Sequence, residues 1–121
     1  MNDRYAIDFF QSTTGHNQIP TVVLRLKRDG EILKEQIEIG QGSFDATWKA
    51  VAKATKTKLH PLVPKFQHIG PFECPCWEAE MQLRNGGSEG YVGKAKHPDM
   101  VTAFAKACVN ALNKAEAAKA A

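Results

Sequence analysis

The residues of this chain best suited to chemistry stand in a short glycine loop, just before an apolar stretch with helical spacing. Gly40, Gln41 and Gly42 come first, and Ser43 and Asp45 follow them. A glycine loop at the start of a helix presents backbone N–H groups and the positive end of the helix dipole, which together suit a carboxylate or a phosphate. Glycine is equally common in tight strand-to-helix turns that bind nothing. The pattern therefore indicates either a site for a small anion or a plain turn.

Metal, redox and acid–base chemistry have weaker support. Cys74 and Cys76 form one close pair, without the second pair that a structural zinc site needs, so we interpret them as ordinary thiols and expect no metal. His97 stands near Asp99 at the entrance to the last helix, where capping is its simplest role. The histidines are scattered and form no Ser-His-Asp or Cys-His motif; they are His16, His60, His68 and His97. We expect no catalytic residue and no cofactor.

The composition is that of one small globular domain. The chain has 121 residues, 43% of them hydrophobic, and is too short for a barrel enzyme of roughly 250 residues. Its net charge is only +3, and its Lys and Arg residues form no stripe that could follow phosphates, so nucleic-acid binding is not expected. Three cysteines, an odd number, indicate a reducing compartment, and we expect a cytoplasmic protein. No apolar stretch has the length of a membrane span, so no membrane partner is expected.

The elements that must position the loop occur twice. Residues 5–58 and 65–119 follow the same order of strands and then a helix, and a proline-containing linker at 59–64 joins them. We therefore expect one domain of two repeated units, each with three strands followed by a helix. The strands are expected at 5–12, 22–27, 32–39, 65–69, 77–83 and 89–95.

The first helix is expected to start at a cap on Ser43 or Asp45 and to run to about Thr55. Its predicted apolar stripe follows helical spacing and consists of Phe44, Trp48, Val51, Ala52 and Thr55. In the second half, the stretch from Gly93 to Asp99 is interpreted as an equivalent glycine-rich break before the last helix. Two similar openings at equivalent points favour a small anionic ligand.

Order and spacing of several signals also resemble a known family. A Thr14-Gly15 turn precedes Pro20 and a strand, and Gly40-Gln41-Gly42-Ser43-Phe44-Asp45-Ala46 opens the first helix. In the last helix, Asp99 is followed by Ala107-Cys108-Val109-Asn110-Ala111-Leu112-Asn113. Nearly the whole chain is similar to the C-terminal regulatory, leucine-responsive dimerisation domain of 2-isopropylmalate synthase and its relatives, citramalate synthase included. Ser43 stands where the family usually has proline.

The resemblance implies a single α+β domain of two pseudo-symmetric βββα units, with antiparallel sheets and two packed helices. This would be a non-catalytic regulatory domain that forms a homodimer and binds a branched-chain amino acid, most simply leucine, as a feedback signal. It also implies a catalytic synthase domain as a partner. Two alternatives stay open: a structural dimerisation module without an effector, or an RNA- or protein-binding α/β module. The resemblance and the glycine loop together predict effector-binding residues in both halves, namely Gly40, Gln41, Gly42, Ser43, Phe44, Asp45, Trp48, Pro71, Ala95, His97 and Asp99.

Overall fold

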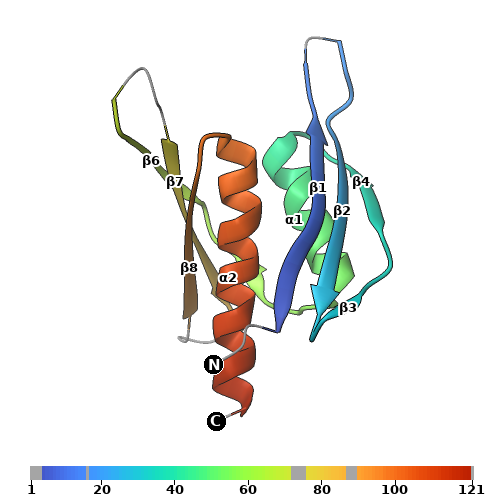
Figure 1. Cartoon of the computed structure of the whole chain (residues 1–121), viewed down its shortest axis with the longest axis vertical. Coiled ribbons are helices and arrows are strands. Elements are labelled where there is room, and N and C mark those ends of the chain that lie inside the picture. Colours follow the sequence, from blue (N-terminus) through green and yellow to red (C-terminus); the bar gives the residue numbers. More distant parts are fainter. Residues whose placement is uncertain (1–3, 16, 72–75, 87–89, 121) are drawn as a thin grey trace. The chain divides into compact units, whose positions relative to one another are not determined.

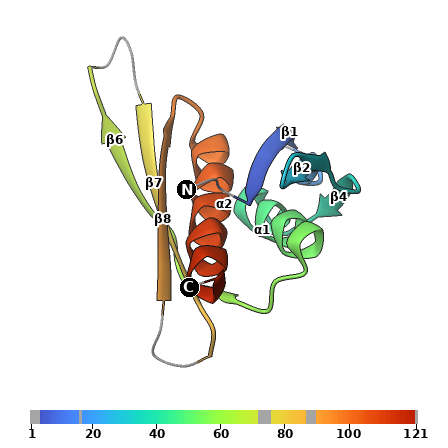
Figure 2. The same cartoon turned by 60° about the horizontal axis from the view of Figure 1, so that its bottom comes forward.

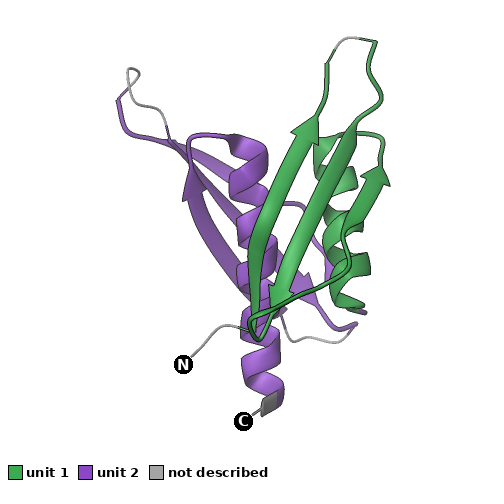
Figure 3. Cartoon of the chain, turned by 45° about the vertical axis from the view of Figure 1, so that its right-hand side comes forward, with its two compact units in different colours: residues 1–57 green, residues 58–121 purple. Residues whose placement is uncertain are grey.

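Two strands with alternating apolar side chains form the centres of two antiparallel sheets in the computed structural model of this chain. The structure describes residues 4–15, 17–71, 76–86 and 90–120. The chain divides into two compact units, unit 1 at residues 1–57 and unit 2 at residues 58–121 (Figure 3). Each described unit contains one sheet and one helix, which confirms the predicted α+β fold with antiparallel sheets and two helices.

In unit 1 the central strand is β2, which pairs with β1 along one edge and with β3 and β4 along the other. Val22, Leu24 and Leu26 alternate along β2 and are fully buried, as expected for a strand with one face against a helix. Helix α1 packs on this sheet, mainly on β2 and β4 (Figures 1 and 2). The elements are β1 (Tyr5–Thr13), β2 (Thr21–Arg28), β3 (Glu31–Ile32), β4 (Gln36–Ile39) and α1 (Ser43–Thr55).

In unit 2 the central strand is β7, which pairs with β8 along one edge and with β5 and β6 along the other. Ala79, Met81 and Leu83 alternate along β7 and are buried. Helix α2 lies along β7 and β8 (Figure 2). The elements are β5 (His60–Pro61), β6 (Lys65–Ile69), β7 (Cys76–Arg84), β8 (Gly90–His97) and α2 (Met100–Ala120).

Two of the predicted strand boundaries were wrong. The strand expected at 32–39 is interrupted at 33–35 and appears as β3 and β4, although both parts pair with β2. The segment 59–64, predicted as the linker between the two repeat units, contains β5, whose residues lie opposite Arg84 and Leu83 of β7. Pro61 is tolerated there because a short strand at a sheet edge can lose one backbone donor.

The glycine-rich break expected from Gly93 to Asp99 was also wrong. Gly93 lies inside β8, opposite Met81, and the strand continues to His97. A Cβ at position 93 would collide with the carbonyl oxygen of Ala107 and the amide nitrogen of Ala111 in α2. Glycine is therefore needed at this point because the helix backbone approaches the strand closely, and not because the chain turns.

The apolar stripe expected on α1 was displaced around the helix. The buried residues are Ala46, Thr47, Ala50 and Val51, whereas Phe44 and Trp48 are half-buried. The chain at Gly40 passes so close that a Cβ there would come within 2.5 Å of the amide nitrogen of Ala46. Small side chains fill the buried side of α1 because little space is left there, and the large aromatic residues lie at its margin.

Candidate functional site

The predicted glycine loop leads directly into α1. Gly42 is the N-cap of the helix, with an extended backbone (φ −170°, ψ 174°), and it provides no side-chain capping bond. The first helical hydrogen bond is donated by the amide of Ala46 to the carbonyl oxygen of Gly42, at 3.0 Å. The cap expected on Ser43 or Asp45 was therefore misplaced by one to three residues. The start of α1 lacks the side-chain oxygen that most helices place on their first amides.

The two glycines of the loop have different structural roles. A Cβ on Gly40 would lie 2.5 Å from the amide nitrogen of Ala46 and 2.9 Å from its Cα, so the loop needs glycine for close approach. A Cβ on Gly42 would meet nothing within 4 Å, and its extended φ is open to any residue. The space beside the helix start is thus at Gly42.

Asp45 lies in the first turn of α1 and turns its carboxylate back toward the loop. Its Oδ2 accepts a hydrogen bond from the amide of Gln41 at 2.9 Å and lies 3.2 Å from Nζ of Lys49. The hydrogen bond from Gln41, followed by that from Lys49, holds the pKa of Asp45 below its usual value of 3.8. A carboxylate is therefore present beside the helix start at neutral pH.

The remaining predicted residues of unit 1 surround the helix start. Ser43, Phe44 and Trp48 are half-buried, and Gln41 is exposed. Phe44 and Trp48 are four residues apart and therefore lie on the same side of α1. The structure thus brings the predicted residues Gly40 to Asp45 and Trp48 together around one end of one helix.

Thr47, one turn further along α1, was not singled out from the sequence. It is fully buried, and within the described residues its Oγ1 has no hydrogen-bond partner. On the same helix, Thr55 donates from Oγ1 to the carbonyl oxygen of Val51 at 2.8 Å. A threonine with helical spacing looks like any other core position in a sequence, so only the structure shows this unsatisfied hydroxyl.

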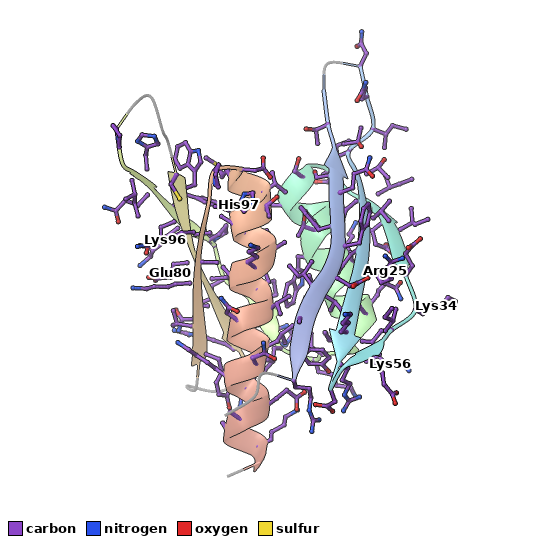
Figure 4. All side chains as sticks on the ribbon, viewed as in Figure 1. Arg25, Lys34, Lys56, Glu80, Lys96 and His97 are labelled. Atoms are coloured by element: carbon purple, nitrogen blue, oxygen red, sulfur yellow. The ribbon has the colours of Figure 1, made fainter. Side chains whose placement is uncertain are left out.

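The start of α2 is closed by its own side chains. Oδ2 of Asp99 accepts hydrogen bonds from the amide of Thr102 at 2.8 Å and from its hydroxyl at 2.6 Å. The amide of Asp99 in turn donates to Nδ1 of His97 at 2.9 Å, which places the ring at the end of β8 (Figure 4). His97 and Asp99 are thus brought together, and their contacts are those of a helix cap.

The other two predicted residues of unit 2 do not join this cap. Ala95 lies within β8, opposite Ala79 of β7. Pro71 is exposed and follows β6, next to residues outside the described ranges. Cys74, which was interpreted as an ordinary thiol, also lies outside those ranges, whereas Cys76 is a half-buried free thiol at the start of β7.

An aromatic row beside the start of α2 was missed in the sequence. Trp77 of β7 lies opposite His68 of β6 on one side and His97 of β8 on the other. The rings of His68 and Trp77 are 5.2 Å apart and meet edge to face. A strand was predicted at 77–83, but the register that aligns the three residues is not encoded in any local motif.

Chemically, the start of α1 offers two complementary features at short range: helix amides without a side-chain cap and an ionised carboxylate.

Within the described ranges, no group of three or more His, Cys, Asp or Glu side chains is placed to hold a metal ion. In the same residues, no helix is both long and apolar enough to cross a membrane. Burial raises the pKa of the Cys108 thiol, so this cysteine stays protonated in the core.

The chain has recognisable relatives among known proteins. It is 32% identical over 114 residues to a 2-isopropylmalate synthase of Carboxydothermus hydrogenoformans, and 32% identical over 110 residues to one of Dictyoglomus turgidum. A 2-isopropylmalate synthase of Pelotomaculum thermopropionicum is 29% identical over 110 residues. These matches cover 93%, 90% and 91% of this chain but 22% of each synthase, so the chain spans about a fifth of the length of these relatives.

The protein family that matches this chain is consistent with these relatives. Residues 1–116 match the LeuA allosteric (dimerisation) domain, which is nearly the whole chain. The predicted resemblance to the regulatory domain of 2-isopropylmalate synthase is thereby confirmed. The chain belongs to the LeuA allosteric (dimerisation) domain family.

Proposed function

We propose that this chain is a regulatory domain that forms a homodimer, binds a branched-chain amino acid at the start of α1, and acts on a catalytic domain of the 2-isopropylmalate synthase type. Leucine is the first candidate for the effector. The observation that carries the proposal is the uncapped helix start at Gly42, in a chain that belongs to an allosteric domain family. The chain itself is expected to be non-catalytic.

An amino acid has two charges, and the start of α1 has a partner for each. The effector carboxylate would accept hydrogen bonds from amides in the first turn of α1, where the helix dipole also favours an anion. The open space at Gly42 leaves room for that approach. The effector ammonium would be attracted to Asp45, whose depressed pKa keeps it ionised.

An apolar effector side chain would then lie against Phe44 and Trp48, which are half-buried at the edge of the helix. Burying one leucine side chain there would contribute roughly 1.5–3 kcal/mol. We narrow the proposed site to unit 1, because His97 and Asp99 are engaged in capping α2. Pro71 and Ala95, which belong to unit 2, stay predictions from the sequence.

One observation favours the alternative of a structural module without an effector. Asp45 already places a negative charge in the first turn of α1 and accepts a hydrogen bond from Gln41. In that alternative, the carboxylate of Asp45 alone complements the helix dipole, and the loop is a plain turn. The two functions differ in whether an added amino acid stabilises the folded chain.

The test is a thermal-shift series with leucine, isoleucine and valine, and with D-leucine as the matched control. A ligand at 100 times its Kd stabilises the folded state by about 2.7 kcal/mol. The proposal expects a concentration-dependent rise in melting temperature with at least one L-amino acid, and none with D-leucine. The fluorescence of Trp48 should change in parallel, and a Trp77→Phe variant isolates that signal. A flat response to all three L-amino acids would favour the structural module.

A further inference from the structure

The face of the unit 1 sheet that lies opposite α1 is unusually apolar. Ile37 and Ile39 of β4 are 64% and 59% exposed, Ile32 of β3 is 60% exposed, and Phe9 of β1 is 40% exposed. The strand register places Ile37 opposite Val23 and Phe9 opposite Arg25, so these side chains lie on one surface. We call this surface, formed by Phe9, Val23, Arg25, Ile32, Ile37 and Ile39, the outer sheet face.

The side chains of β4 alternate between its two faces, and Ile37 and Ile39 are the exposed ones. Glu38, between the two isoleucines, points to the α1 side, where its Oε1 lies 2.9 Å from Nζ of Lys53. A strand with one face on a helix and one face in water normally places its polar residues outward. Here the aliphatic residues point outward, which is typical of a strand whose outer face is covered.

The sheet of unit 2 has the same kind of topology but a different outward surface. On the side of β7 and β8 opposite α2, Glu80 is paired with Lys94 at 3.5 Å, and Glu78 lies opposite Lys96. Glu80 and Lys96 project into solvent there (Figure 4). This charged surface is typical of a sheet face exposed to water, and it makes the apolar surface of unit 1 a specific property of that unit.

The charges on the outer sheet face are already neutralised by their neighbours. Nε of Arg25 lies 2.6 Å from Oδ2 of Asp8, and its NH1 lies 3.3 Å from Oε2 of Glu35. Lys27 lies 3.6 Å from the other oxygen of Asp8. Covering this face would therefore not leave an unpaired charge in an apolar contact, which is the costly outcome in most buried interfaces.

We propose that a second copy of this chain docks on the outer sheet face, by face-to-face packing of the same surface on both copies. The inference rests on the homodimer of the proposed function and names its contact surface. The family is described as a dimerisation domain. Val51, Phe104 and Cys108 of the helices are not available for that contact, because they are buried within the single chain.

A contact between identical faces is also the simplest one for this surface. A two-fold dimer requires a self-complementary patch, and an aliphatic patch without net charge meets its copy without like-charge repulsion. Stacked sheets pack about 10 Å apart with interdigitated apolar side chains. Ile37 and Ile39 would lie in such a layer.

The experiment measures the dimer dissociation constant by sedimentation equilibrium for the wild type, Ile37→Lys and Val63→Lys. Val63 is 86% exposed and belongs to unit 2, so its substitution adds the same charge at a residue that is not part of the outer sheet face. The wild type is expected to be a dimer at tens of micromolar. Ile37→Lys should raise the dissociation constant at least about tenfold, whereas Val63→Lys should leave it unchanged. Both side chains are exposed, and circular dichroism checks that both variants fold.

The outcomes separate this inference from the proposed function. A dimeric wild type with an equally tight Ile37→Lys dimer would overturn the docking surface and leave the homodimer standing. Equal weakening by both substitutions would also overturn it, because a general charge effect would then explain the change. A monomeric wild type would overturn the homodimer and, with it, this surface.

Discussion

Helix α1 begins at a glycine that has no side chain to offer its amides, whereas α2 begins at an aspartate whose carboxylate already accepts from them. At α2, His97 adds a second bond by accepting from the amide of Asp99. Both helices follow a strand and a short connection, so the order of elements does not explain the difference. The two helix starts therefore differ in capping: the start of α2 is capped by its own side chains, whereas the start of α1 has no side-chain cap.

The glycines at the start of α1 should respond very differently to alanine. Gly40→Ala should lower the free energy of unfolding by about 2–3 kcal/mol, because its Cβ would collide with the backbone of Ala46. Gly42→Ala should cost less than about 1 kcal/mol, because its Cβ would meet open space and only the N-cap preference changes. Urea unfolding of both variants measures the difference. Equal costs would contradict the assignment of close approach to Gly40 alone.

Removing the cap of α2 should affect stability but not ligand binding. Asp99→Ala should cost about 1–2 kcal/mol of unfolding free energy, because the amide and the hydroxyl of Thr102 both lose their acceptor. The leucine affinity should stay unchanged if the start of α2 is purely structural. Calorimetric titration checks this point, and a large loss of affinity in folded Asp99→Ala would return Asp99 to the effector site.

The buried hydroxyl on α1 should make the chain less stable than it could be. Thr47→Val replaces the side chain with one of similar shape and removes an unsatisfied buried oxygen, so the free energy of unfolding should rise by about 1 kcal/mol. Thr55→Val is the matched control, because it breaks the hydrogen bond to Val51 and should not stabilise. A loss of stability in Thr47→Val would show that the hydroxyl has a partner after all.

The smallest effect on stability is expected from substitution of Asp45 in the absence of ligand. Its folded pKa is lowered, so it contributes stability above its unfolded pKa, near 3.8, and that stability is lost as the pH falls through the folded value. Asp45→Asn should therefore lower the melting temperature at pH 7 by about 2 °C or less, because the carboxylate is exposed and screened. The difference from wild type should vanish near pH 2. A difference that grows with acid would have the wrong sign for this account.

The sequence predicted where α1 lies, and the helix runs from Ser43 to Thr55, but it did not predict which of its residues are buried. The strand predicted at 22–27 is present as β2, and Val22, Leu24 and Leu26 alternate along it because one face of the strand is covered. Of the stripe predicted on α1, Val51 is buried, but Phe44 and Trp48 are only half-buried, because the buried side of the helix holds mainly small side chains. Gly93 was taken for a turn for a related reason: close approach to a helix 14 or more residues away leaves no local signal.

The candidate site shows the same division. Gly40, Gly42 and Asp45 are neighbours in the sequence, so their grouping at the start of α1 could be predicted from a local motif. The hydrogen bond that the amide of Gln41 donates to Asp45 could not be predicted, because it depends on side-chain geometry. Trp77 was missed because its neighbour His68 reaches it only through the register of β6 and β7.

The most direct test of the open start of α1 is a calorimetric titration of leucine into wild type and Gly42→Asp, with Gly42→Asn as the matched neutral control. The extended φ and open space at Gly42 allow all three proteins to fold alike, and circular dichroism checks it. The new carboxylate would cap α1 and repel the ligand, so we predict a loss of about 2 kcal/mol or more, roughly thirtyfold in Kd, with a smaller loss for Gly42→Asn. An unchanged leucine affinity in folded Gly42→Asp would contradict the account.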